Sequence, residues 1–157
     1  NDVPKGRDII FMMGEVDVGF LVWLRAETTG STVVKCMEEA FQRYTSFLSD
    51  VKADHPNIKI CSVPLPTISD DDAHGDIANA RSEINVTQKE RTELTLKFNS
   101  MLKVWSRENE FEYFDFDLLA LDVETNLVKE SLLNKNTSDH HYGDEEFFCL
   151  IRKVLSF

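Results

Sequence analysis

Two adjacent histidines lie near the end of the chain, directly after an aspartate, in the segment Asn136–Phe148 (NTSDHHYGDEEFF). A carboxylate beside a histidine fixes the tautomer of the imidazole and stabilises its protonated form, which is the arrangement of a general base. Asp139 is the candidate carboxylate, and His140 or His141 is the candidate base. The segment therefore predicts general-base chemistry, and other residues must supply the group that the base activates.

Two short apolar runs that end in polar residues indicate where such a base would act. Residues 8–13 (DIIFMM) end at Gly14, and residues 57–66 (NIKICSVPLP) end in an acidic loop. Continuous apolar runs of this length are typical of strands that are buried on both faces of a parallel sheet. Ligands of open parallel sheets bind beyond the carboxyl ends of the strands. We expect the loop of residues 139–141 to reach this edge.

Amphipathic helices alternate with the apolar runs. Apolar residues spaced three and four apart mark the helix faces, and Thr87 with Glu90 forms a capping box. We expect helices over Ser31–Lys52, from Thr87 onward and over Asp144–Leu155. Residues 111–119 (FEYFDFDLL) predict a third strand. Strands that alternate with helices imply an α/β fold, a three-layer sandwich whose parallel sheet has helices on both faces.

The composition is that of an acidic globular protein. The 157 residues include 17 Lys and Arg and 28 Asp and Glu, which gives a formal net charge of −11, and 42% are hydrophobic. This apolar content is sufficient for a core, and the negative charge repels nucleic acid and anionic membrane surfaces. No apolar run approaches the roughly 18 residues of a membrane-spanning helix. We therefore expect neither nucleic acid nor membranes among the partners.

The cysteines and histidines do not indicate a metal site. Cys36, Cys61 and Cys149 are odd in number and lack a CxxC spacing, so we interpret them as free thiols. His140 and His141 are adjacent, and neighbouring side chains of an extended segment point in opposite directions. No metal or other cofactor is expected. Free thiols and net acidity favour a cytoplasmic location.

Four segments, taken in order, resemble motifs of the SGNH (GDSL-like) hydrolase superfamily, which comprises serine esterases with a three-layer α/β fold. Gly14–Asp17 (GEVD) resembles that family's Gly-x-Asn-Asp block, and Val63-Pro64 ends the second apolar run as a Val-Pro pair does in the family. Residues 91–102 (RTELTLKFNSML) resemble its Arg…Leu…Asn…Leu helix. Residues 138–142 (SDHHY) resemble its late Asp-x-x-His block. The order of these motifs carries the resemblance.

The resemblance implies a flavodoxin-like sheet and a role for the paired histidines. His141 is preferred as the general base because the apolar Tyr142 follows it, and Asp139 would orient it. The family's aspartate lies three residues before its histidine, whereas Asp139 lies two before His141 and one before His140. Which histidine is the base is therefore left open.

The same resemblance suggests which residues would contact the oxyanion or the substrate. Gly14 would donate its backbone N–H to an oxyanion. Val16 stands at the position of the family's oxyanion-hole asparagine, and Asp17 is the neighbouring polar residue. Gly14 and Asp17 are the two candidates, although an ionised carboxylate at Asp17 would repel an oxyanion.

The family's Gly-Asp-Ser block has no counterpart, because residues 1–7 (NDVPKGR) contain no serine. Residues 1–157 are thus expected to form a single SGNH-like domain that is the carboxyl-terminal portion of one, with an exposed sheet edge. Ser31 stands at the start of a predicted helix, and we interpret it as the N-cap of that helix rather than as a nucleophile.

Two functions from different classes are consistent with these residues. The first is ester hydrolysis through a serine acyl-enzyme, with a small-molecule or carbohydrate ester as substrate and the serine outside this chain. The second is a non-catalytic binding or scaffolding module, a pseudoenzyme with the same fold. A second chain or segment that completes the sheet is a candidate partner.

Overall fold

The computed structural model describes residues 7–70, 84–136 and 139–155. Three parallel strands, β1 (Ile9–Phe11), β2 (Ile58–Cys61) and β3 (Glu112–Phe114), form a sheet in the order β1-β2-β3. Ile10 of β1 lies beside Lys59 of β2. The parallel sheet predicted from the alternation of strands and helices along the chain is therefore confirmed.

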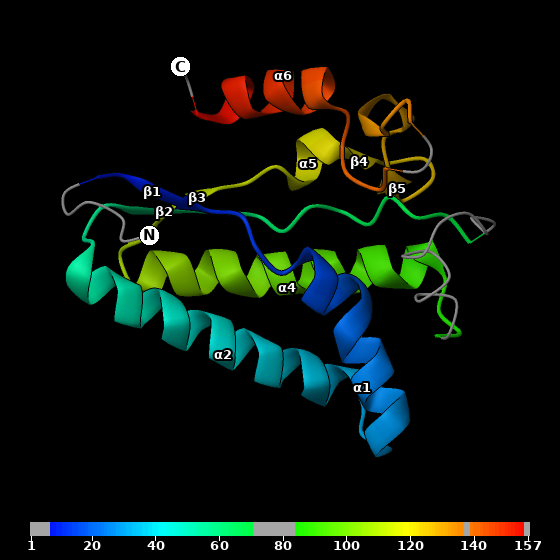
Figure 1. The fold of residues 1–157 in the computed structure, drawn as a ribbon, viewed down its shortest axis with the longest axis horizontal. Helices are drawn as coiled ribbons and strands as arrows, with labels where there is room; N and C mark the ends of the chain where they lie inside the picture. Colours follow the sequence, from blue (N-terminus) through cyan, green and yellow to red (C-terminus); the bar gives the residue numbers. More distant parts are fainter. Residues whose placement is uncertain (1–6, 71–83, 137–138, 156–157) are drawn as a thin grey trace.

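Helices cover both faces of this sheet (Figure 1). α2 (Val33–Asp54) and α4 (Gln88–Glu108) lie on one face, and α6 (Asp144–Leu155) lies on the other. The arrangement is the predicted three-layer sandwich. None of the described helices is long and apolar enough to cross a membrane.

Each face of the sheet has its own apolar core. Ile60 of β2 packs with Phe98 and Leu102 of α4 on one face, and all three side chains are at most 1% exposed. Leu65 and Phe116 pack with side chains of α6 on the other face. Burial of a large apolar side chain stabilises the fold by about 2 kcal/mol. The two cores fix the helices against the sheet, and with them the loops at the ends of the strands.

A local signal sets the start of α4. Thr87 is the N-cap of α4: its Oγ1 accepts from the N–H of Glu90 at 3.2 Å, and Oε2 of Glu90 accepts from the N–H of Thr87 at 2.8 Å. The predicted capping box is confirmed. α6 runs over Asp144–Leu155, as the periodicity predicted.

The assignment of Ser31 as a helix N-cap was wrong. Thr32 is the N-cap of α2, and its side chain accepts from the N–H of Lys35 at 3.2 Å. Ser31 instead donates its N–H to the carbonyl of Ala26 at 3.0 Å, behind Gly30, whose φ is 65°. The backbone N–H of Ser31 is therefore bonded to the preceding helix, and the side chain of the next residue, Thr32, caps α2.

Two regions contain elements that the sequence did not indicate. A π-helical turn, η1 (Asp17–Leu21), continues directly into α1 (Val22–Thr29). The strand expected over residues 111–119 is confined to Glu112–Phe114, and the short helix α5 (Asp117–Ala120) takes up part of the rest. The hairpin β4 (Leu121–Asp122) and β5 (Leu127–Val128) and the 3₁₀ turn η2 (Glu130–Leu132) come next along the chain.

Candidate active site

His141 and Asp139 form a hydrogen-bonded pair in the loop before α6. Nδ1 of His141 lies 2.7 Å from Oδ1 of Asp139, and the backbone N–H of His141 donates to the same oxygen at 3.0 Å. The backbone bond, followed by the side-chain bond, holds the pKa of Asp139 below its usual value. Since the ionised carboxylate occupies Nδ1, Nε2 of His141 is the nitrogen that can exchange a proton with a substrate or nucleophile.

This pair lies at the protein surface. The His141 side chain is 79% exposed and that of Asp139 is 41% exposed. Solvent therefore screens their attraction, and the contact orients the imidazole more than it stabilises the fold. A catalytic role for the pair requires a bound substrate or another segment to exclude water.

The loop that carries the pair is fixed from both sides. Nδ2 of Asn134 donates to Oδ2 of Asp139 at 3.1 Å, and Leu133 forms an antiparallel bridge with Tyr142. Tyr142 is buried, and its hydroxyl oxygen accepts from the N–H of Leu65 at 2.8 Å. These contacts tie the loop to the segment after β2, so the His141–Asp139 pair sits at the carboxyl edge of the sheet.

The two histidines occupy different environments. His140 is half-buried, and its carbonyl accepts a hydrogen bond from the hydroxyl of Thr67. Its Nε2 is buried and finds no hydrogen-bond partner among the described residues. The structure thus pairs Asp139 with His141 through side chains, whereas His140 turns its ring toward the interior.

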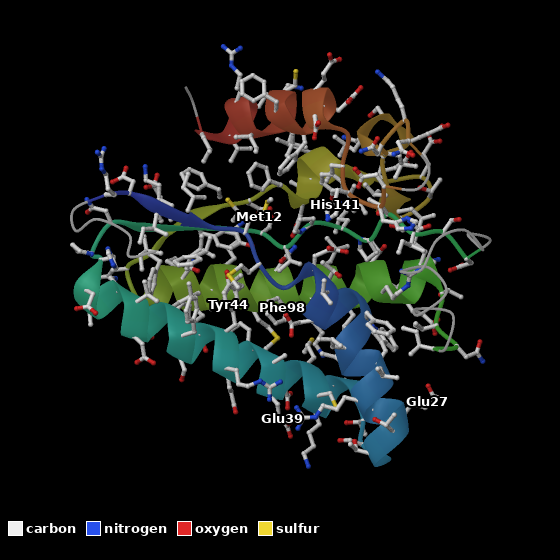
Figure 2. The ribbon with its side chains drawn as sticks, in the orientation of Figure 1. Met12, Glu27, Glu39, Tyr44, Phe98 and His141 are labelled. Carbon is white, nitrogen blue, oxygen red and sulfur yellow. The ribbon has the colours of Figure 1, made fainter. Side chains whose placement is uncertain are left out.

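A cavity of about 160 Å³ lies beside the pair. Its walls come from three loops: Met12 and Glu15 after β1, Pro64, Leu65 and Thr67 after β2, and His140, His141, Tyr142, Asp144 and Phe147 around the start of α6. Met12 lies at the end of β1, and His141 lies on the α6 side of the sheet (Figure 2). Loops that follow β1 and β2 and the loop before α6 therefore meet around one cavity.

The structure does not place Asp17 with this pair. Asp17 and Gly14 line a second cavity, of about 230 Å³, against α2, whereas Glu15 faces the cavity of His141. Gly14 has a φ of 108°, and a Cβ atom there would come within 3.1 Å of Cγ2 of Val63. Residues 15 and 16 are helical and continue into η1, so the side chains of Glu15 and Asp17, two residues apart, project in different directions.

The buried amide of Asn99, the asparagine of the segment RTELTLKFNSML, supports the end of β2. Oδ1 of Asn99 accepts from the N–H of Val63 at 2.8 Å, and Nδ2 of Asn99 donates to the carbonyl of Val63 at 3.0 Å. Pro64, which is next to Val63, lines the cavity of His141. The signal that could have identified this residue is an amide placed between Phe98 and Leu102 on the apolar face of a helix.

The same amide contacts a carboxyl group with a shifted pKa. Nδ2 of Asn99 also donates to Oδ1 of Asp117 at 2.8 Å. Burial, with a smaller contribution from the charge of Asp115, raises the pKa of Asp117 to about 6. Within residues 7–70, 84–136 and 139–155, no cluster of three His, Cys, Asp or Glu side chains could hold a metal ion.

Comparisons with known proteins support the fold. Neither the family models nor the curated proteins match the sequence. A GDSL-like lipase from Bacteroides thetaiotaomicron superposes with a TM-score of 0.63 at 15% identity, over 95% of this chain and 60% of its own. A "putative acylhydrolase" from Bacteroides fragilis superposes with a TM-score of 0.54 at 14% identity, over 76% of this chain and 50% of its own. This chain thus spans 60% or less of the length of these two structures, and it has the SGNH-like α/β fold.

Proposed function

We propose that this chain belongs to an SGNH-like ester hydrolase in which His141 and Asp139 activate a serine that lies outside the chain. The observation that carries the proposal is the 2.7 Å contact between Nδ1 of His141 and Oδ1 of Asp139, beside a cavity at the carboxyl edge of the sheet. The fold is that of a GDSL-like lipase, which supports the reaction class.

The proposed reaction relies on the free Nε2 of His141. This nitrogen takes the proton of the serine hydroxyl while the serine oxygen attacks the ester carbonyl. The imidazolium, stabilised by Asp139, then donates that proton to the leaving alcohol, and an acyl-enzyme remains. Water, deprotonated by the same nitrogen, hydrolyses the acyl-enzyme and restores the serine.

The open edge of β1 is where the serine would enter. β1 pairs with β2 on one side, and on its other side no described strand is present. A strand added parallel to β1 would end beside Met12, which lines the cavity of His141. It would also cover the edge of β1 beside Ile10, whose side chain is 43% exposed. A second chain or another segment that forms this strand is therefore the proposed partner.

The cavity favours a short acyl group. Its volume of about 160 Å³ equals that of roughly five water molecules. Leu65, Tyr142 and Phe147 give it apolar walls, and Glu15 and Thr67 give it polar ones. The apolar part would hold a short acyl chain, and the polar part would meet the hydroxyl groups of a small-molecule or carbohydrate alcohol.

Hydrolysis of p-nitrophenyl acetate, butyrate and octanoate by the natively isolated protein tests this function. The two short esters should be turned over faster than octanoate. His141→Ala should lower kcat by about 10³-fold, which is the usual contribution of a general base. His140→Ala is the matched control and should retain most activity. Absence of turnover with all three esters, in a folded sample, would contradict the proposal.

A non-catalytic binding module is the second candidate. The high exposure of His141, and the absence of serine from the described residues that line its cavity, favour it. Such a protein would show a rise in melting temperature with a carbohydrate or ester ligand, but no turnover. Melting temperature with ligand and ester turnover, measured on the same protein, therefore separate the two functions.

A further inference from the structure

The second cavity lies away from the His141–Asp139 pair, between the loop after β1 and α2. Its volume is about 230 Å³. Figure 2 shows Tyr44 and Phe98 side by side between α2 and α4, on the other side of the sheet from His141. The proposed ester hydrolysis does not use this cavity, so a ligand bound there would be independent of that function.

The walls of this cavity are apolar and held in place. Phe98 is 1% exposed, and its ring stacks on Tyr44 with 6.5 Å between centroids. Phe47, on the outer wall, packs edge-on against Phe11 of β1 at 5.4 Å. Met13 completes the walls at the end of the β1 loop. Preformed aromatic walls with a few polar groups at the mouth are typical of small-molecule sites.

Two oppositely charged side chains, those of Asp17 and Arg43, lie at the mouth of this cavity. Asp17 and Arg43 line this cavity and also an adjoining one of about 340 Å³, so they lie where the two meet. Both residues are exposed, and neither side chain forms an ion pair or hydrogen bond with another residue in the described ranges. Arg25, which lines the adjoining cavity, is by contrast paired with Glu39 at 2.8 Å. The mouth thus carries one carboxylate and one guanidinium that no side chain of the described residues holds in an ion pair.

We infer that this cavity binds a free α-amino acid with a large apolar side chain, such as phenylalanine, leucine or methionine. Arg43 would bind the carboxylate of the ligand and Asp17 its ammonium group, through charge-assisted hydrogen bonds. A fatty acid would meet repulsion from Asp17, and an alkylamine would meet repulsion from Arg43. A zwitterion satisfies both.

The size of the cavity agrees with this ligand class. A volume of about 230 Å³ equals that of roughly eight water molecules, which suits one aromatic or branched side chain. The ring would lie between Phe47 and Phe98, where aromatic pairs gain energy beyond burial alone. The charged end of the amino acid would stay at the mouth, in contact with water.

Isothermal titration of the purified protein with L-phenylalanine tests the inference. Saturable binding is expected for phenylalanine and for leucine. Three analogues each lack one recognised group: 3-phenylpropionate lacks the ammonium, phenethylamine lacks the carboxylate, and glycine lacks the side chain. Each should bind at least tenfold more weakly than phenylalanine, since each forfeits one charge-assisted contact or the apolar burial.

Two variants assign the charges to their residues. Arg43→Gln should weaken phenylalanine binding by about tenfold, and the variant should no longer prefer phenylalanine to phenethylamine. The Asp17→Asn variant should no longer prefer phenylalanine to 3-phenylpropionate. Lys97→Gln and Glu93→Gln, at exposed positions on α4, are the matched controls and should bind as the parent does. All four changes are at exposed side chains, and melting temperatures check that each variant is folded.

Three results would overturn the inference. One is the absence of saturable binding by phenylalanine, leucine, methionine and tryptophan to folded protein. Another is equal affinity for phenylalanine and 3-phenylpropionate, which would indicate a site for apolar carboxylates. The third is unchanged binding in both the Arg43 and the Asp17 variant. Ester hydrolysis is measured separately, so failure here leaves the proposed function untouched.

Discussion

Asn99 and Asp117 are joined by a hydrogen bond of 2.8 Å from Nδ2 of the amide to Oδ1 of the carboxyl group. The same amide holds the peptide group of Val63 through both its N–H and its carbonyl. One side chain of α4 therefore links the end of β2 to the start of α5. Pro64, which follows Val63 and lines the cavity of His141, is held in place by this link.

Replacement of Asn99 by leucine should destabilise the protein by about 2–4 kcal/mol. The change would leave the N–H and carbonyl of Val63 buried without partners, and each unsatisfied group costs about 1–3 kcal/mol. Urea unfolding measures the loss. Ser100→Ala, at the exposed neighbouring position of α4, is the matched control and should change stability by less than about 0.5 kcal/mol. An Asn99→Leu variant as stable as the parent would show that the amide bonds contribute little.

Asp117 should make the protein less stable as pH rises from about 4 to about 7. Its pKa is raised to about 6 in the folded protein, from 3.8, so the unfolded chain loses this proton first. The contribution of the group is complete below the unfolded pKa and is lost as pH rises through the folded pKa. Because the carboxyl group is partly exposed, we expect a loss of about 1–2 kcal/mol rather than the full value for this shift.

Asp117→Asn should remove this pH dependence. An amide oxygen can still accept from Asn99, and no charge is buried at pH 7.5. The free energy of unfolding of the variant, minus that of the parent, should therefore be about 1 kcal/mol larger at pH 7.5 than at pH 4.5. Identical pH profiles would contradict the assigned shift, and Glu93→Gln serves as the control for removal of an exposed charge.

The start of α2 offers a paired test of helix capping. Thr32→Ala should destabilise the protein by about 1 kcal/mol, because the N–H of Lys35 loses its acceptor. Ser31→Ala should have little effect, since only the backbone of Ser31 takes part in the turn. Thermal unfolding of both variants checks this, and a larger loss at Ser31 would restore the interpretation of that residue as the cap.

Strong local signals made much of the fold predictable. The capping box at Thr87 and the apolar periodicity of Asp144–Leu155 located two helices, and short apolar runs located β1 and β2. η1 and α1 were missed because residues 18–24 (VGFLVWL) are almost continuously apolar and show no helical period. Such a run does not distinguish a buried strand from a helix.

The candidate site was predictable only where its residues are close in sequence. Asp139 and His141 are two residues apart, and one turn brings them together. The separation of Glu15 from Asp17 depends on the helical conformation of residues 15–21, which the nearly continuous apolar run after Asp17 did not reveal. The role of Asn99 depends on a contact with Val63, which lies 36 residues away.

Labelling with a serine-reactive fluorophosphonate, read by intact mass, tests the central claim most directly. The natively isolated protein should carry the label on a serine outside residues 1–157, in another segment or on a partner chain. Labelling should disappear in His141→Ala and persist in His140→Ala. Absence of label from every chain of a folded sample, or labelling that is indifferent to His141, would contradict the assignment of His141 as the base.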